Sequence, residues 1–264
     1  MRIVQISDTH LSQDKSRFLD NWAPLSAWIA DQHPDLVIHT GDVTVDGAGV
    51  EADLVFGAQL MGKLGSRARV LPGNHDVGDA RDPQQPVNAE RLGAWRRYFG
   101  PDRWVEDVTA GTQRWRLVGF DALLVGSGEP EEDAQLAWLE QVMAEAEERR
   151  IAWFLHRPLF LDRPDEGDTG YWSIKPEQRL ALMDLVRRHR VALVASGHLH
   201  KARDFIFEGT RYVWSPSSGF LVGKAQPEMP GEKHLGAVVY ELNGPALTAR
   251  IVEVPGLTQH WVGQ

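Results

Sequence analysis

VALVASGHLH (residues 191–200) places two histidines directly after a run of apolar residues. The run 191–194 predicts a strand that is covered on both faces. Gly197 lets the backbone leave the sheet sharply. His198 and His200 are two residues apart, so in an extended segment their side chains point to the same side. A single histidine at a strand end is ordinary, but this pair raises the question of a metal site, because imidazole is a common metal ligand.

Four other apolar segments end in the same kind of residue. The polar residues that follow them are Asp8 and His10, Asp42, Asn74 with His75 and Asp76, and His156. Each has an ordinary explanation: an aspartate can cap a helix, Gly73-Asn74 can form a plain turn, and His156 can be a core histidine bonded to a carbonyl. Their recurrence at the carboxyl ends of strands, where open α/β sheets bind ligands, favours a common site.

The rest of the pattern alternates strands with helices. Strands are predicted at 2–7, 35–42, within 69–76, at 151–158 and at 191–196; helices at 17–32, 50–64, 133–150 and 176–190; and hairpins at 114–127, 205–216 and 237–254. This order predicts one α/β domain over residues 1–264 with appended antiparallel strands. Three polar loops, 77–90, 161–173 and 216–234, are long enough to suggest functional roles.

Composition narrows the function. With 28 basic and 37 acidic residues the net charge is −9, which argues against nucleic acid as a partner. The chain has no cysteine, which excludes disulfides and thiol catalysis. A metal must therefore be held by His, Asp, Glu, Asn or backbone oxygen. Neither a signal peptide nor a membrane span is recognisable, so we expect a cytoplasmic protein.

The motifs D-x-H, G-D, G-N-H-D, a lone H and G-H-x-H occur in this order between residues 8 and 200. Together they resemble the calcineurin-like metallophosphoesterase superfamily. They look most like its bacterial branch of cyclic-nucleotide and glycerophosphodiester phosphodiesterases. That branch leads us to expect a second histidine after His156, where this chain has Arg157. The resemblance implies a four-layer α/β/β/α sandwich with metals at the carboxyl ends of the strands.

The resemblance further implies two metal ions, manganese or iron first, with zinc or cobalt as alternatives. One ion would be held by Asp8, His10, Asp42 and His200. The other would be held by Asn74, His156 and His198, with Asp42 bridging the two. Two divalent ions against two carboxylates leave about two positive charges, which would attract an anionic phosphate in an otherwise acidic chain.

The implied activity is hydrolysis of a small phosphodiester by a hydroxide that bridges the metals. In this scheme His75 faces the phosphate as a catalytic group, and Asp76 orients His75. A phosphomonoesterase stays open as an alternative, and so does a non-catalytic binding scaffold. Tyr171, Trp172 and Phe220 are either stacking groups for substrate or loop anchors. Self-association is also left open.

Overall fold

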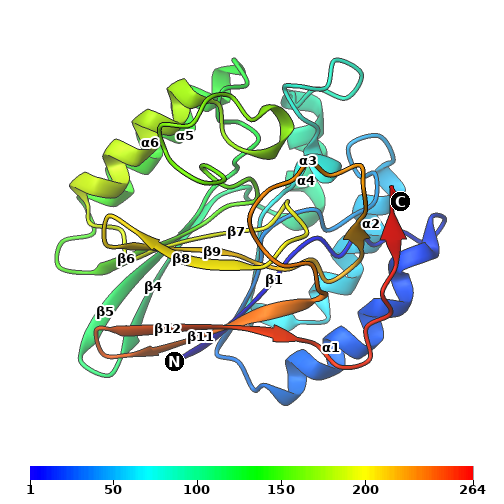
Figure 1. Ribbon diagram of the computed structural model, residues 1–264, viewed down its shortest axis with the longest axis horizontal. Coiled ribbons are helices and arrows are strands. Elements are labelled where there is room, and N and C mark those ends of the chain that lie inside the picture. The colour runs from blue at the N-terminus through cyan, green and yellow to red at the C-terminus, as the bar shows by residue number, and fades with distance from the viewer. Residues whose placement is uncertain (264) are drawn as a thin grey trace.

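Two β-sheets pack face to face in the computed structural model, and helices cover both outer faces (Figure 1). This is the predicted four-layer α/β/β/α arrangement. The structure describes residues 1–263, so Gln264, the last residue of the predicted domain, lies outside it.

The first sheet has five strands in the order β12-β11-β1-β2-β3. Its strands are β1 (Arg2–Ile6), β2 (Leu36–His39), β3 (Ala68–Val70), β11 (Gly236–Asn243) and β12 (Ala246–Glu253). Strands β1, β2 and β3 are parallel, whereas β11 pairs antiparallel with both β1 and β12. The predicted hairpin at 237–254 is therefore confirmed, with Asn243 opposite Ala246 across the turn.

The second sheet has six strands in the order β4-β5-β6-β7-β9-β8. Its strands are β4 (Trp104–Ala110), β5 (Gln113–Gly119), β6 (Arg150–Phe154), β7 (Leu193–Ser196), β8 (Arg203–Phe207) and β9 (Thr210–Trp214). Strands β5, β6, β7 and β9 are parallel, and β4 and β8 are antiparallel edges. A separate two-stranded ribbon joins β10 (Leu221–Val222) to β13 (Trp261–Val262).

Side chains alternate along each central strand between two buried layers. Ile3 of β1 and Phe154 of β6 belong to the cluster between the sheets. Their neighbours Val4 and Trp153 belong to the cluster beneath the helices. Because both faces are covered, these strands read as continuous apolar runs.

The helices lie on the outer faces. In Figure 1, α5 (Pro130–Ala144) and α6 (Pro176–Arg188) cover the second sheet, and α1 (Trp22–Asp31) and α2 (Glu51–Gly62) cover the first. The remaining helical segments are η1 (Ser16–Asn21), η2 (Gly65–Arg67), α3 (Asn74–Val77), α4 (Ala89–Phe99) and η3 (Gly170–Trp172). No helix within residues 1–263 has both the length and the apolar character needed to cross a bilayer.

The predicted hairpin at 114–127 is wrong. β5 pairs instead with β4, which precedes it, and residues 122–126 form turns followed by a bend at 127. The apolar residues of this turn are buried, and the Asp121 carboxylate accepts a hydrogen bond from the Leu123 amide at 2.7 Å. Gln135 of α5 holds the same turn through both main-chain groups of Asp121. The predicted loop 77–90 is confirmed except that α4 begins inside its end, with Asn88 accepting from the Arg91 amide.

Candidate metal centre

Seven polar side chains meet where five strands end. Asp8 and His10 follow β1, Asp42 follows β2, Asn74 begins α3 after β3, His156 follows β6, and His198 and His200 follow β7. All seven are buried, each at most 7% exposed. Both sheets contribute, since their parallel strands end at the same rim. The structure thus brings together every residue that the sequence nominated as a ligand.

The backbone turns sharply to present them. Five of the seven have a positive φ: Asp8, His10, Asp42, His198 and His200. Side-chain-bearing residues rarely adopt this left-handed conformation, which costs about 1–3 kcal/mol at each position. Such strain persists only where the surroundings enforce it and is typical of functional sites.

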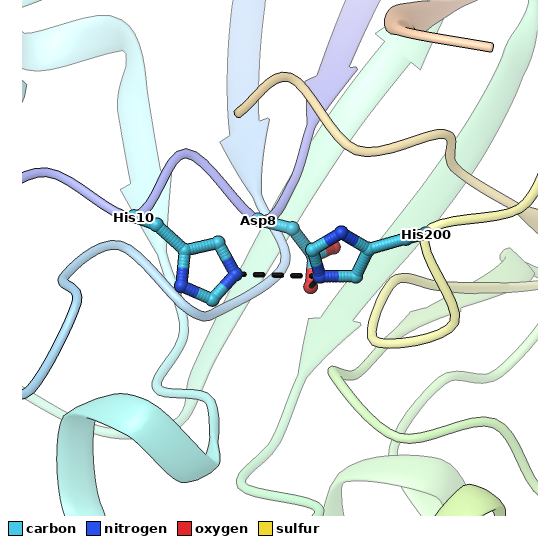
Figure 2. A group of neighbouring side chains, drawn as sticks. All are labelled: Asp8, His10 and His200. Carbon is cyan, nitrogen blue, oxygen red and sulfur yellow. Dashed lines mark hydrogen bonds and ion pairs between the residues drawn. The ribbon is translucent and has the colours of Figure 1, made fainter. Parts of the chain in front are cut away.

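One group of donor atoms consists of Asp8, His10 and His200. Figure 2 shows the two rings facing one another beside the carboxylate, with Nε2 of His10 3.3 Å from Nε2 of His200. Oδ1 of Asp8 lies 3.4 Å from the same His200 nitrogen. That oxygen is buried and has no hydrogen-bond partner among the described residues. A buried carboxylate oxygen without a partner is costly, and a cation would satisfy it.

A second group consists of Asp42, His156 and His198. Nε2 of His156 lies 3.2 Å from Nδ1 of His198 and 3.3 Å from Oδ2 of Asp42. Oδ1 of Asn74 lies 3.2 Å from the same nitrogen of His156. Three potential donor atoms thus lie within 3.3 Å of Nε2 of His156.

Asp42 lies between the two groups. Its Oδ2 is 3.3 Å from His156 and 3.9 Å from Nε2 of His10. For metal–ligand bonds of about 2.0–2.2 Å, neighbouring ligand atoms are about 3.0–3.5 Å apart. The spacings of 3.2–3.4 Å within each group, and the mixture of imidazole, carboxylate and amide donors, therefore suit divalent metal ions, whereas the 3.9 Å from Asp42 to His10 is longer than this range.

Main-chain carbonyl groups orient three of the imidazoles. Nδ1 of His156 lies 2.8 Å from the carbonyl oxygen of Thr40, and Nδ1 of His200 lies 2.7 Å from that of Phe220. Nε2 of His198 lies 2.9 Å from the carbonyl oxygen of Tyr171. Each carbonyl accepts the ring hydrogen, so the other nitrogen presents its lone pair to the centre. These partners carry no side-chain signature in the sequence.

The charges suit cation binding. Burial opposes ionisation of Asp42, but neighbouring His156 and His75 hold its pKa well below the ordinary value. Burial lowers the pKa of His10 and of His198 well below the ordinary value. Carboxylates and neutral imidazoles are the forms that bind metals. His156 is the exception: burial opposes its charge, but Asp42 raises its pKa to about 9. The proton on Nε2 of His156 lies between the donor atoms where a bound cation would lie.

His75 lies beside the centre, and one of its ring nitrogens lies within 4.8 Å of donor atoms of His10 and Asp42. Its Nδ1 is 2.7 Å from the carbonyl oxygen of Val45, and its main-chain amide donates to Oδ1 of Asp42 at 2.9 Å. The ring packs edge-on against His10, with centroids 4.7 Å apart. With Nδ1 engaged, Nε2 is the nitrogen available to a substrate.

Asp76 does not have the predicted contact with His75. Its carboxylate accepts from the amides of Val43, Thr44 and Gly73 and from the Thr44 hydroxyl, at 2.7–3.0 Å. The prediction that Asp76 orients the His75 ring is therefore corrected. Asp76 joins the loop after β2 to the loop after β3, and so sets the positions of Asp42 and Asn74.

The aromatic residues of the loops serve as anchors. The Phe220 ring packs on His200 and His10, at 4.3 and 4.6 Å between centroids. The hydroxyl of Tyr171 accepts from Nδ2 of Asn74 at 2.9 Å. Arg157, which stands where a second histidine was expected, forms a buried ion pair with Asp79 and lies over the Tyr171 ring.

A cavity of about 470 Å³ opens beside the centre. Its walls include Asn74, His75, Asp79, Arg81 and Tyr171. Arg81 pairs with Asp168 at 2.7 Å, which links the predicted loops 77–90 and 161–173. A larger cavity of about 820 Å³ lies between the edge strands β8 and β12, away from the donor atoms.

Comparison with known proteins agrees with this geometry. The family model for calcineurin-like phosphoesterases matches residues 1–202. A probable glycerophosphodiester phosphodiesterase, GpdQ, of Arcobacter nitrofigilis is 28% identical over 219 residues, covering 76% of this chain and 72% of that protein. The 3′,5′-cyclic adenosine monophosphate phosphodiesterase CpdA of Escherichia coli is 28% identical over 233 residues, covering 83% and 76%. The solved structure of GAP50, an anchor in the inner membrane complex of Plasmodium, aligns with a TM-score of 0.70 at 14% identity, covering 98% of this chain and 86% of that one. That last likeness shows the fold alone.

Proposed function

The chain belongs to the calcineurin-like phosphoesterase family, a family of metal-dependent hydrolases, and on that premise we propose that it hydrolyses small phosphodiesters at a dinuclear metal centre. The observation that carries the proposal is the position of Asp42 between two groups of buried donor atoms.

In this proposal each ion is held by four residues, and Asp42 is shared by both ions. Asp8, His10, Asp42 and His200 hold one ion, and Asn74, His156, His198 and Asp42 hold the other. When bound, the two ions supply an activated water and stabilise the charge on the phosphoryl group. Manganese or iron are our first choices and zinc or cobalt the alternatives, because all four accept imidazole and carboxylate ligands.

His75 is the proposed general acid. The Val45 carbonyl retains the hydrogen on Nδ1, so the imidazolium form carries its second proton on Nε2. As the bond from phosphorus to the leaving oxygen breaks, that proton passes to the leaving alkoxide. The ring then returns to the neutral tautomer that Val45 already favours. Fixing the tautomer in this way lets a single nitrogen exchange protons with the substrate.

The cavity supports a small substrate. Its volume of about 470 Å³ is within the range of small-molecule sites. Arg81 on its wall is paired with Asp168, and Asp79 and Asp82 also line the cavity, so in this proposal the attraction for an anionic substrate comes from the metal ions. The two relatives named as phosphodiesterases favour a cyclic nucleotide or a glycerophosphodiester. A phosphomonoester is the second candidate, since the same metal pair would serve both.

An activity panel with Mn²⁺ tests the proposal. It includes bis-p-nitrophenyl phosphate, p-nitrophenyl phosphate, 2′,3′- and 3′,5′-cyclic nucleotides, and glycerophosphodiesters. We expect diesters to be hydrolysed with higher kcat/KM than p-nitrophenyl phosphate, and chelation to abolish the activity. Preference for the monoester would select the second candidate.

Metal content provides the control for the remaining alternative. The protein is purified without chelator, and bound metal is measured per chain. A chain that binds no metal and hydrolyses nothing in the panel would instead be a binding scaffold that has kept the fold.

A further inference from the structure

Tyr171 contacts two of the candidate ligands at once. It lies in η3, within the loop after β6, and its hydroxyl accepts from Nδ2 of Asn74 at 2.9 Å. Its main-chain carbonyl oxygen lies 2.9 Å from Nε2 of His198. Its ring also packs on the His198 ring, with centroids 4.5 Å apart.

The contact with Asn74 selects the atom that faces the centre. An asparagine amide has one oxygen, which can bind a metal, and one NH₂ group, which cannot. Because the NH₂ group donates to Tyr171, Oδ1 is turned towards His156, 3.2 Å away. Without the phenol the amide could rotate by half a turn and present hydrogens to a cation.

The contact with His198 acts in the same direction. The carbonyl accepts the hydrogen of Nε2, so Nδ1 carries the lone pair, and Nδ1 is the nitrogen that faces His156. The other donor group has a different support, because His200 is held by the Phe220 carbonyl at 2.7 Å. Among the candidate ligands, Tyr171 therefore orients members of the group formed by Asn74, His156 and His198, and not His200.

The side chain of Tyr171 is itself held in place. The Arg157 guanidinium lies 5.7 Å from the ring centroid and pairs with buried Asp79. The hydroxyls of Thr169 and Ser173, on either side of η3, are 2.6 Å apart. These contacts keep the phenol towards Asn74, although the residue as a whole is 38% exposed.

We propose that Tyr171 is a positioning residue for the metal site of Asn74, His156 and His198, where it holds the amide oxygen and one imidazole lone pair towards the ion. The inference rests on the proposed dinuclear centre. Its test is metal affinity, so it does not depend on which ester is hydrolysed.

The experiment is calorimetric titration of metal-depleted protein with Mn²⁺. In the wild type we expect two binding phases, and Asn74→Ala identifies the second site as the phase that it weakens most. Tyr171→Phe should weaken that same phase by about 10-fold or more, as loss of a group that orients a ligand typically does. The other phase should stay within about 2-fold of the wild type, which also shows that the variant is folded.

Tyr98→Phe is the matched control. Tyr98 also bonds through its hydroxyl, to Glu51 at 2.7 Å on the surface. This substitution removes the same atom from a tyrosine that contacts none of the candidate ligands. It should leave both binding phases unchanged.

A double-mutant cycle separates orientation from general loosening of the loop. In Asn74→Asp both terminal atoms are oxygens, so either rotamer offers a ligand. Tyr171→Phe should therefore cost less than about 3-fold when added to Asn74→Asp. An undiminished cost in that background, or equal weakening of both phases, would overturn the positioning role.

The two proposals fail in different ways. A wild type that binds a single Mn²⁺ would overturn the dinuclear centre and this inference with it. A wild type with two phases and a Tyr171→Phe variant that matches it would overturn only the role of Tyr171.

Discussion

The main-chain carbonyl oxygen of Val45 lies 2.7 Å from Nδ1 of His75 and accepts the hydrogen on that nitrogen. The relationship leaves Nε2 as the one nitrogen of His75 that can exchange a proton with a substrate. His156 and His200 have the same kind of carbonyl contact at Nδ1, so this contact fixes the ring of His75 but does not by itself separate His75 from the candidate ligands.

The role of His75 predicts a dependence on the leaving group. His75→Ala should retain metal but lose kcat by about 10²–10⁴-fold on an alkoxide-releasing diester such as a glycerophosphodiester. The loss should be much smaller on bis-p-nitrophenyl phosphate, because nitrophenolate needs little protonation. Steady-state kcat on both substrates, with metal content determined in parallel, checks this. Equal losses on the two substrates would leave His75 as an electrostatic group rather than an acid.

The position of Asp42 predicts that one substitution disturbs both ions. Asp42→Ala removes the oxygen that faces His10 and His156, so both sites lose a charged ligand. After saturation with Mn²⁺ and desalting, we expect fewer than one ion per chain by elemental analysis. Asn74→Ala is the comparison, because it removes one neutral ligand and should retain close to one ion. An Asp42→Ala variant that kept two ions would refute the bridging assignment.

We expect substitution of Asp76 to lower the stability of the fold and not only the catalytic rate. The carboxylate accepts four hydrogen bonds that join the loops after β2 and β3. In Asp76→Asn one oxygen becomes an NH₂ group that faces main-chain N–H donors. We expect the free energy of unfolding to fall by about 2–4 kcal/mol, measured in urea, and Mn²⁺ affinity to fall as well. If only kcat fell, with stability unchanged, the originally predicted role beside His75 would be restored.

The central strands lie where the sequence predicts them, and the candidate ligand residues lie together at one rim, for a physical reason. Strands such as β7 are buried on both faces and read as unbroken apolar runs, and the polar residues that follow them must lie at one rim of the sheets. In contrast, α4 buries only Leu92 and Trp95 among three arginines, so its periodicity is weak. The apolar run after Asp121 resembles a strand in sequence because residues buried in a turn have the same apolar composition.

The main-chain partners of the histidines and the contacts of Asp76 could not be predicted from the sequence, for a different reason. The carbonyl groups of Thr40 and Phe220 act through main-chain atoms, which any residue possesses. The role of Asp76 depends on how two loops far apart in the chain approach each other. Such contacts follow from the fold and cannot be predicted from residue types alone.

Asp121 predicts a pH dependence of stability outside the metal centre. Burial, and secondarily the charge of Asp102, raise the pKa of this carboxyl to about 8 from an ordinary value of 3.8. Between these values the unfolded chain loses the proton while the folded chain keeps it. Rising pH therefore favours unfolding until the folded group also ionises near pH 8. The stability that this group contributes is complete below about pH 4 and is lost progressively up to about pH 8.

The variant Asp121→Asn isolates this effect. The amide keeps an oxygen that accepts the hydrogen bond from the Leu123 amide, but it cannot ionise. The variant therefore avoids the loss of stability that comes from burying an ionisable carboxyl at high pH. Urea unfolding of wild type and variant at pH 5 and pH 8.5 gives the difference in free energy at each pH. As pH rises from 5 to about 8, we expect the free energy of unfolding of the variant to increase relative to that of the wild type by roughly 1.4 kcal/mol per pH unit. Above about pH 8 the difference should stay constant. Asp14→Asn, which makes the same substitution at an exposed position, is the control for the change of residue itself. A difference between Asp121→Asn and the wild type that stays constant from pH 5 to pH 8.5 would mean that Asp121 is ionised throughout, with its charge stabilised inside the fold.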